Sequence, residues 1–327
     1  MTRVAAVDCG TNTIRLLVAD LTREETGRPR LEPLRRRNEI VRLGQGVDRT
    51  GLLDPAALER TLAVVEDYAA DCAELGVEPG RGARRFVATS ATRDARNRED
   101  FAAGVRSLLG VDPEVVSGQE EAHLSFAGSL LGARGTDDGG APRLVVDLGG
   151  GSTELVLGVD APAAAISLNT GSVRITERYL ADGVTPAAEA AARAEVRGLL
   201  DRAAQAVNLA ATGRLVGLAG TITTVTAHAL GLADFDAEAI DGAELAVGAA
   251  LASCDAIVHF TAAERESWAY LRPGRRDVIA AGALVWSEVI SRVVAETTAA
   301  GRPLAAAVTS LHDILDGIAL SLAVPVP

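Results

Sequence analysis

The stretch VVDLGGGSTELVLG occupies Val145 to Gly158, and an earlier stretch, AVDCGTNTIRLLVA, occupies Ala6 to Ala19. The two align without a gap at a constant offset of 139 residues, which matches Asp8 to Asp147. Each is typical of a strand that ends in an aspartate, a glycine-bearing turn with a hydroxyl residue, and a returning strand. The repetition predicts that the chain contains two copies of one structural unit.

Length and composition favour a two-domain α/β protein. The 327 residues exceed the size at which a single hydrophobic core usually stops growing, about 250 to 300 residues. Hydrophobic residues make up 48% of the chain and aromatic residues only 3%, a balance typical of helix-rich α/β folds. Strand-like and helix-like segments alternate, and Asp54 and Pro55 should begin one helix as its N-cap and first residue. The glycine-rich segment 132–142 is the best linker candidate.

The charge pattern limits how the protein handles phosphate. The formal net charge is −12, which argues against nucleic-acid and membrane-surface partners, because both draw affinity from a basic field. All 32 basic residues are arginine, so neither a P-loop lysine nor Schiff-base chemistry is available. A phosphate would have to be held by backbone amides, hydroxyl groups, arginines and a metal ion.

The cysteines and the N-terminus favour a cytoplasmic protein. Cys9, Cys72 and Cys254 are widely spaced and form no CxxC pair, which is typical of reduced thiols. The chain leads from Met1 into a strand-like run without the pattern of a secretory signal, and no apolar stretch is long enough to span a bilayer. We therefore expect a cytoplasmic location.

The glycine-bearing turns are candidates for anion binding. Glycine admits the backbone dihedrals of a concave nest, in which successive N–H groups point the same way and bind an anion. A plain tight hairpin is the alternative for one such turn, but two equivalent copies favour paired phosphate loops that face each other across a cleft. The candidate phosphate-binding residues are Gly10, Thr11, Asn12 and Thr13 in the first copy and Gly149, Gly150, Gly151 and Ser152 in the second.

The two copies differ in their acidic residues. Where the first copy has Arg15, the second has Glu154, which lies on the arm of the hairpin opposite Asp147. Two carboxylates beside an anion nest are unfavourable unless a cation lies between them. A hydrated magnesium ion, held by one or two carboxylates and by the phosphate, would meet this need. The alternative is that Glu154 is a solvated strand residue.

The motif SGQEEAHLSFAG supplies a third acid. Ser117 and Glu120 have the spacing of a capping box, which gives Glu120 a local role. Glu121 then lies in the first turn of a helix that follows a strand end, where α/β folds bind ligands. A glutamate there can align water and accept its proton during attack on phosphorus. The alternative is a favourable interaction with the helix dipole alone.

Two further stretches combine a strand, a hydroxyl-rich turn and a helix. In VATSATRDARN, Arg93 extends from the first turn of a helix and is suited to gripping two phosphate oxygens. In GLAGTITTVTAHA, Gly220 and Thr223 belong to a similar turn. Helix capping alone also explains the hydroxyl groups of both stretches. The arginines at 35–37 and Arg42 either add positive charge to the cleft or form an exposed strand face.

The chain resembles the exopolyphosphatase and guanosine pentaphosphate phosphatase (Ppx/GppA) family, which belongs to the sugar kinase, heat-shock chaperone and actin superfamily. The family's motifs occur in order over nearly the whole length: DCGTNTIRLLV, RLGQGV, ATSATRDARN, SGQEEAHLSFAG, VVDLGGGSTELVLG, TGSVRITERY, GLAGTITT, RRDVIAAGALV and HDILDGIAL. The resemblance implies an α/β fold of two ribonuclease H-like domains with a cleft between them. We expect the first domain at residues 1–130, completed by a C-terminal helix at 310–327, and the second at 131–309.

The resemblance also implies roles for the candidate residues. Glu121 matches the proposed base for the attacking water, while Asp147 and Glu154 match acids that hold Mg²⁺, or Mn²⁺, and orient that water. The two glycine-bearing loops and Arg93 match phosphate ligands. Arg275 matches an arginine near the polyanion, and the GTITT turn matches a segment that touches adenosine in nucleotide-using relatives.

The activity that the resemblance implies is that of an exopolyphosphatase, a metal-dependent hydrolase that releases terminal orthophosphate from inorganic polyphosphate. Long family members carry a further helical region that this sequence lacks, so we expect shorter chains, or guanosine pentaphosphate, as substrates. An ATP-dependent kinase of the same superfamily and a non-catalytic sensor of polyphosphate or alarmones are the alternatives. We expect a homodimer, and neither nucleic acid nor a membrane as a partner.

Overall fold

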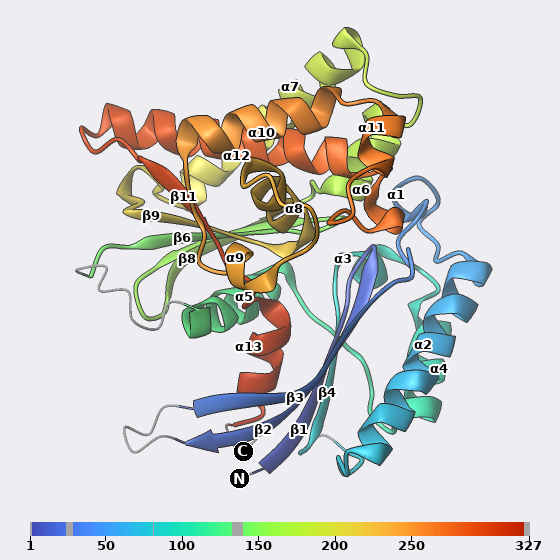
Figure 1. The fold of residues 1–327 in the computed structure, drawn as a ribbon. Helices are drawn as coiled ribbons and strands as arrows, with labels where there is room; N and C mark the ends of the chain where they lie inside the picture. The colour runs from blue at the N-terminus through green and yellow to red at the C-terminus, as the bar shows by residue number, and fades with distance from the viewer. Residues whose placement is uncertain (1, 24–28, 81, 133–139, 324–327) are drawn as a thin grey trace. The chain divides into compact units, whose positions relative to one another are not determined.

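The computed structural model describes residues 2–23, 29–80, 82–132 and 140–323. The chain divides into two compact units, which are described separately (Figure 1). Unit 1 comprises Met1–Gly128 and Asp313–Pro327, and unit 2 comprises Ser129–His312. Most of the predicted linker, residues 133–139, lies outside the described residues. Within the described ranges, no helix combines the length and the apolar character needed to cross a membrane.

Unit 1 contains a five-stranded sheet in the order β3-β2-β1-β4-β5. Its strands are β1 (Thr2–Cys9), β2 (Thr13–Arg23), β3 (Pro29–Ile40), β4 (Arg84–Ala88) and β5 (Glu114–Val115). The first three strands form an antiparallel meander, whereas β4 runs parallel to both β1 and β5. The carboxyl ends of β1, β4 and β5 therefore meet at one edge of the sheet, where α/β folds bind ligands.

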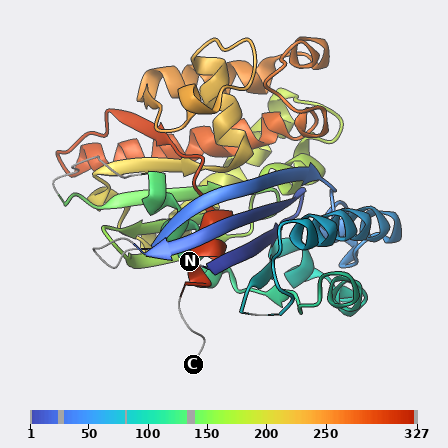
Figure 2. The same ribbon diagram turned by 60° about the horizontal axis from the view of Figure 1, so that its bottom comes forward.

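Helices cover both faces of this sheet, with α13 (red) against one face and α2 and α4 against the other (Figure 2). The helices are α1 (Val47–Thr50), α2 (Pro55–Glu74), α3 (Ser90–Asp94), α4 (Arg98–Leu109), α5 (Gly118–Gly132, which ends in unit 2) and α13 (Ile314–Ser321). Along β1, Ala5 and Val7 pack with α2 and α4, while Ala6 packs with α5 and α13. This alternation follows the two-residue period of a strand, so both faces of the sheet are buried.

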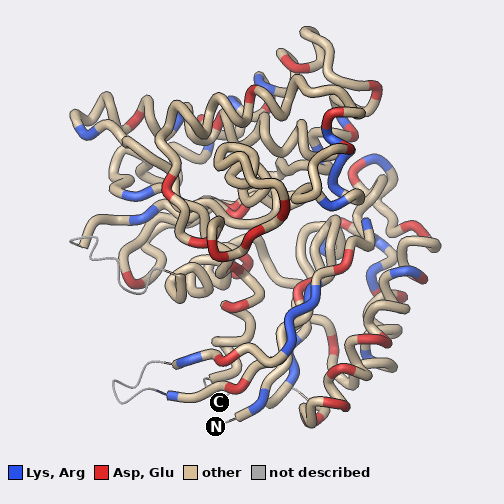
Figure 3. The backbone as a smooth tube through the Cα atoms, viewed as in Figure 1, with Lys and Arg blue, Asp and Glu red and all other residues tan. Residues whose placement is uncertain are grey.

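Side chains at the start of α2 and along β3 stabilise unit 1. The Asp54 side chain accepts hydrogen bonds from two N–H groups at the start of α2, and Pro55 is the first helical residue, which confirms the predicted cap. The basic stretch along β3 is visible in Figure 3. Its arginines bond to carboxylates of the same unit: Arg35 and Arg37 to Asp71, and Arg36 to Asp316. These arginines therefore tie β3 to α2 and α13.

Unit 2 contains a six-stranded sheet in the order β10-β11-β9-β6-β7-β8. Its strands are β6 (Arg143–Leu148), β7 (Thr153–Gly158), β8 (Pro162–Leu168), β9 (Arg214–Leu218), β10 (Glu244–Ala246) and β11 (Ala306–Thr309). β6, β7 and β8 form an antiparallel meander, and β9 is parallel to both β6 and β11. From β8 to β11 this order repeats that of unit 1 from β3 to β5, which confirms the duplication predicted from the repeated turn.

The helices of unit 2 cover its sheet and follow its strand ends. They are α6 (Ser172–Ile175), the π-helical turn η1 (Thr176–Leu180), α7 (Pro186–Ala206), the short 3₁₀ turn η2 (Leu209–Ala211), α8 (Ala219–Ala229), α9 (Ala237–Ile240), α10 (Val247–His259), α11 (Ala262–Glu266), η3 (Pro273–Arg275) and α12 (Ile279–Ala299). The core lies between the sheet and α12, where Trp286 packs against Gly217 of β9. Helix α6 follows the strand β8 and reaches the turn between β6 and β7.

Candidate active site

The two glycine-bearing turns contain the same backbone hydrogen bond. The Gly10 N–H donates to the Thr13 carbonyl at 2.9 Å, and the Gly149 N–H donates to the Ser152 carbonyl at 3.0 Å. The φ angles of Gly10 and Gly149 lie outside the left-handed region, so the predicted reason for glycine, an unusual dihedral, is wrong at these two positions. A Cβ on Gly149 would lie 3.1 Å from the Ser152 carbonyl oxygen, so the closeness of the turn itself disfavours a side chain there.

The first loop is held through its carbonyl groups. Backbone N–H groups within residues 41–44 donate to the carbonyl oxygens of Thr11 and Asn12 at 2.8 to 3.0 Å. A trans peptide points its N–H opposite to its C=O, so the N–H groups of Asn12 and Thr13 are directed away from residues 41–44. The Thr11 hydroxyl also lies 2.9 Å from the Ser90 hydroxyl, which brings the ATSATR turn against this loop within unit 1.

The second loop is held in the same way by a different segment. Backbone N–H groups of residues 172–174 donate to the carbonyls of Gly149 and Gly150 at 2.9 to 3.1 Å. The Nε atom of Arg174 donates to the Gly151 carbonyl at 2.8 Å. The following N–H groups, up to that of Ser152, are therefore directed away from residues 172–174. The two turns thus share one feature: the N–H groups that follow their bonded carbonyls are directed away from the segment that donates to those carbonyls.

Asp147 and Glu154 form a pair of buried carboxylates in unit 2. They are directly opposite each other in the register of β6 and β7, so their side chains lie on the same face. Asp147 is 7% exposed and Glu154 only 1% exposed, so the alternative of a solvated strand residue is wrong for Glu154. The Ser167 hydroxyl donates to Glu154 Oε1 at 2.7 Å and orients it.

This carboxylate pair fits a divalent cation. Two adjacent buried carboxylates repel each other, and a cation between them removes the repulsion. In the part of the chain that the structure describes, no group of three or more His, Cys, Asp or Glu side chains gathers around one point. A cation between Asp147 and Glu154 would therefore take its remaining ligands from water and phosphate, as Mg²⁺ commonly does.

Glu121 and Arg93, predicted separately, bond to each other in unit 1. Glu121 lies in the first turn of α5 and is buried, and its Oε2 accepts a hydrogen bond from Arg93 Nη1 at 3.1 Å. The same Arg93 nitrogen donates to the Val116 carbonyl at 3.0 Å, so the guanidinium is fixed at the end of β5. The predicted base and the predicted phosphate ligand therefore occupy one place in the fold.

The neighbouring Glu120 is different. Its N–H donates to the Ser117 hydroxyl at 3.2 Å, which is one half of the predicted capping box. Its carboxylate accepts a hydrogen bond from Arg85 at 2.8 Å, so it is drawn to an arginine of β4. The predicted capping box is therefore confirmed only in its backbone half, because the Glu120 carboxylate bonds to Arg85 of β4, 35 residues away in the sequence, and not to the Ser117 N–H.

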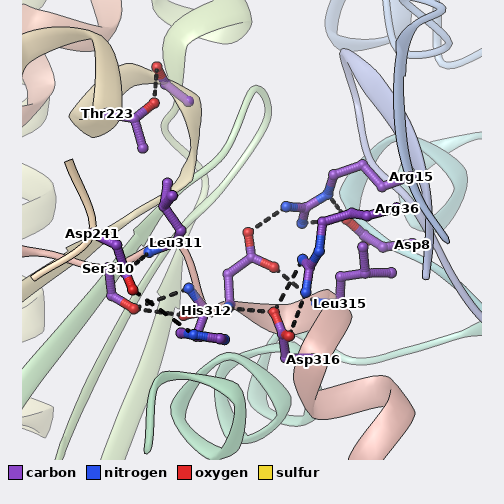
Figure 4. A network of polar contacts seen from close by, with 12 residues as sticks. Asp8, Arg15, Arg36, Thr223, Asp241, Ser310, Leu311, His312, Leu315 and Asp316 are labelled. Atoms are coloured by element: carbon purple, nitrogen blue, oxygen red, sulfur yellow. Dashed lines mark hydrogen bonds and ion pairs between the residues drawn. The ribbon is translucent and has the colours of Figure 1, made fainter. Parts of the chain in front are cut away.

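The first hairpin carries an ion pair that the sequence analysis does not foresee. Asp8 and Arg15 are directly opposite in the register of β1 and β2, and Arg15 Nη2 donates to Asp8 at 2.6 Å. Arg15, shown beside Asp8 in Figure 4, also bonds to Asp313, the N-cap of α13. Burial raises the pKa of Asp8, and the charge of Arg15 opposes that shift. The first turn therefore has an internal cation where the second has a glutamate.

Arg275 lies against the GTITT turn within unit 2. A Cβ on Gly220 would overlap the Arg275 guanidinium, so the guanidinium lies directly against the backbone at the start of α8. The preceding residue, Ala219, has a φ of 73°, a strained conformation of the kind often found at binding sites. The Thr223 hydroxyl donates back to the Gly220 carbonyl at 3.2 Å, so it bonds within its own helix.

Sequence reasoning missed Arg174, the side chain that bonds to the second loop. It belongs to the motif TGSVRITERY, which carries no recognisable ligand pattern by itself. The predicted residues divide between the units: Gly10, Thr11, Asn12, Thr13, Arg93 and Glu121 lie in unit 1, and Asp147, Gly149, Gly150, Gly151, Ser152, Glu154 and Arg275 lie in unit 2.

Two duplicated α/β units, each with a glycine-bearing turn after its first strand, define a two-domain α/β protein of the actin-like fold. The model of the Ppx/GppA phosphatase family matches residues 21–299. The chain therefore belongs to the Ppx/GppA phosphatase family, and it is a phosphoanhydride hydrolase. The predicted family and the predicted class of fold are both confirmed.

Individual relatives match the chain over almost its whole length. It is 44% identical over 329 residues to Exopolyphosphatase 2 from Mycobacterium tuberculosis, covering 99% of both chains. The crystal structure of an exopolyphosphatase-like protein is 42% identical, with a TM-score of 0.90 and coverage of 98% of this chain and 97% of that one. A Ppx/GppA family member from Aquifex aeolicus is 25% identical, with a TM-score of 0.75 and the same coverage.

Proposed function

We propose that the chain is an exopolyphosphatase that hydrolyses the terminal phosphoanhydride bond of inorganic polyphosphate and releases orthophosphate. This proposal rests on one observation about the two turns. The carbonyl groups of each turn accept hydrogen bonds from a neighbouring segment, so the N–H groups of the turn are directed away from that segment and can donate to an anion. The similarity to Exopolyphosphatase 2 over the full length supports the same activity.

The two turns bind the terminal phosphoryl group through their backbone N–H groups. Backbone N–H groups of residues 10–13 and 149–152 donate to its oxygens. Phosphoryl transfer is catalysed mainly by positioning and by neutralising charge on the transferring group. Amides and arginines supply both, which suits a sequence that contains no lysine.

Glu121 acts as the base that accepts the proton of the attacking water. Its carboxylate is buried and oriented by Arg93 through Oε2. A guanidinium has five N–H donors in a planar fork, so Arg93 can bond to Glu121 and donate to a phosphate oxygen at the same time. Arg93 thereby aligns the base with the substrate.

Asp147 and Glu154 hold a divalent cation, which we propose to be Mg²⁺ or Mn²⁺. Members of this family generally depend on a divalent metal. When bound, the cation neutralises negative charge on phosphate oxygens. The hydrogen bond from Ser167 fixes the orientation of Glu154, as outer-shell partners of metal ligands commonly do.

Arg275 and the start of α8 bind phosphate groups further along the polyanion. Both carry positive charge, and they lie against each other at Gly220, so an anion is attracted to the two together. The same pair suits the phosphates of guanosine pentaphosphate, which is the second candidate substrate. The homodimer and the cytoplasmic location also belong to this proposal. The three cysteines are buried free thiols, which fits a reducing compartment.

The test is phosphate release from polyphosphates of graded length, from guanosine pentaphosphate and from ATP, each with and without Mg²⁺. An exopolyphosphatase releases orthophosphate from polyphosphate without any acceptor. A kinase would require an acceptor, and a sensor would bind polyphosphate without releasing phosphate at any Mg²⁺ concentration.

A further inference from the structure

The segment Thr170–Arg174, here called the support segment, begins after β8, includes the first three residues of α6 and packs against the second loop. Its backbone N–H groups donate to the carbonyls of Gly149 and Gly150, and its last side chain donates to Gly151. The Thr153 hydroxyl donates in return to the Thr170 carbonyl at 2.8 Å. One short segment therefore fixes three consecutive loop carbonyls.

Gly171 makes this approach possible. Its backbone is extended, with φ 177° and ψ 175°, a conformation that any residue adopts. A Cβ there would lie 2.6 Å from the Gly150 carbonyl oxygen and 2.7 Å from that of Gly149. Because both obstacles are backbone atoms, no side-chain movement relieves the clash. Glycine is therefore required for contact between the support segment and the loop.

Arg174 is the side chain that completes this contact. It is only 9% exposed, and its Nε donates to the Gly151 carbonyl at 2.8 Å. Burying a guanidinium costs free energy that an apolar side chain of similar size would not cost. The peptide that carries the Gly151 carbonyl also carries the Ser152 N–H, which points to the opposite side. The direction of that N–H is therefore set by the bond from Arg174.

We propose that Arg174 is a positioning residue of the phosphate site, an inference that rests on the proposed function. Its hydrogen bond holds the peptide between Gly151 and Ser152 so that the Ser152 N–H donates to the terminal phosphoryl group. The hydrogen bond, rather than the positive charge, is the essential contribution. In the first loop the corresponding carbonyls accept backbone N–H groups of residues 41–44.

Three substitutions separate the hydrogen bond from the charge. In Arg174→Gln the amide nitrogen takes the place of Nε, so the bond to Gly151 persists without a positive charge. In Arg174→Lys the charge persists, but a carbon stands in the place of Nε. Arg174→Met removes both. Arg202→Met, which changes an exposed arginine of α7, is the matched control.

Binding of tripolyphosphate in the presence of Mg²⁺ is measured by calorimetry, and kcat and KM are measured from phosphate release. Only variants whose unfolding midpoint shows a folded chain are compared. Arg174→Gln and Arg202→Met should bind within about threefold of the unsubstituted chain, whereas Arg174→Lys and Arg174→Met should bind at least about tenfold more weakly. The KM values should follow the same order.

Binding that follows the charge, strong in the Lys variant and weak in the Gln variant, would overturn the positioning role. Equal binding by all three Arg174 variants would overturn it too. If Arg174→Met does not fold, the comparison of Gln with Lys decides. A chain that binds tripolyphosphate in the predicted order but releases no phosphate would instead overturn the proposed exopolyphosphatase activity and leave the role of Arg174 standing.

Discussion

The hairpins β1–β2 and β6–β7 share one turn but differ in charge. In the first, Asp8 faces Arg15, which bonds to it at 2.6 Å and also bonds to Asp313. In the second, Glu154 takes the position that matches Arg15 and faces Asp147. The backbone hydrogen bond of the turn is the same in both, at 2.9 and 3.0 Å. A difference at one matched position thus separates an aspartate that faces an arginine from an aspartate that faces a glutamate, which is the pair we propose to hold the cation.

This comparison assigns separate tasks to the two hairpins. In the proposed function both hairpins provide N–H groups for an anion, and the second also holds the cation. Glu121 lies on neither hairpin, so the proposed activation of water is a third task with its own side chain. Each task can be removed separately, and the effects should differ in size and in kind.

Replacing Glu121 should have the largest effect. Glu121→Gln should lower phosphate release by about 10²- to 10⁴-fold, the usual contribution of a general base, while tripolyphosphate binding persists. The control is Glu120→Gln, which changes the adjacent glutamate that bonds to Arg85 and should retain activity. Unchanged turnover in Glu121→Gln would show that Glu121 is not the base that activates water.

Neutralising one carboxylate of the second hairpin should have the next largest effect. Glu154→Gln keeps the size of the side chain and an oxygen to accept the bond from Ser167, but it removes the charge. The Mg²⁺ concentration needed for half-maximal phosphate release should rise about a hundredfold. Titration of phosphate release with Mg²⁺ measures the shift. An unchanged Mg²⁺ requirement would show that Glu154 does not hold the cation, and the two hairpins would then not differ in cation binding.

Breaking the ion pair of the first hairpin should affect stability. In Arg15→Met, two buried carboxylates, Asp8 and Asp313, lose their shared cation, so the free energy of unfolding should fall by about 3 to 5 kcal/mol. Urea unfolding measures this loss. Arg106→Met breaks a largely exposed pair with Asp112 and should change stability by no more than about 1 kcal/mol. A loss no larger than in this control would contradict the structural role of Arg15.

The same variant should depend on pH in a defined direction. Burial raises the folded-state pKa of Asp8 above its ordinary value of 3.8, and Arg15 opposes that rise. Ionised Asp8 therefore opposes folding, and this cost disappears as the pH falls through the raised pKa. Without Arg15 the pKa rises further, so the stability deficit of Arg15→Met should shrink between about pH 7 and about pH 4. Urea unfolding at several pH values should show this convergence with the unsubstituted chain, and a constant deficit would argue against it.

The smallest effect should come from the far end of the first hairpin. Arg3 bonds to Asp20 at 2.8 Å, and this hydrogen bond lowers the pKa of Asp20 below 3.8. The stabilisation is therefore present above pH 3.8 and is lost as the pH falls through the lowered folded-state pKa. Arg3→Met should lower the thermal unfolding midpoint slightly at neutral pH, and by less under strongly acidic conditions, where the variant loses only the bond from Arg3 to the Leu75 carbonyl, at 2.9 Å. A midpoint difference of the same size at both pH values would mean that the pair with Asp20 adds no stability.

Local features of the fold are predictable from the sequence because their parts are neighbours in the chain. The repeated hairpin and the cap of α2 at Asp54 are of this kind. The bond from Arg15 to Asp313 joins residues 298 positions apart, and no sequence spacing indicates it. The predicted reason for glycine at position 149 is wrong, because the close approach of the Ser152 carbonyl, and not a left-handed dihedral, disfavours a side chain there.

The candidate site is predictable to a similar extent. Residue types and motifs single out Glu121 and Arg93 one at a time, but only the fold shows that they bond to each other at 3.1 Å. Glu154 has two open interpretations in the sequence, and burial excludes the solvated one. Arg174 could not be predicted, because it bonds to a backbone carbonyl. Every residue has such a carbonyl, so the residue types in the sequence do not reveal the bond.

A crystal structure of the Glu121→Gln variant with tripolyphosphate and Mg²⁺ would show directly whether both turns bind the same phosphoryl group. We expect a single terminal phosphoryl group to accept hydrogen bonds from N–H groups of residues 10–13 and of residues 149–152. A phosphoryl group that accepts hydrogen bonds from only one of the two loops would mean that the duplicated turns do not share one anion.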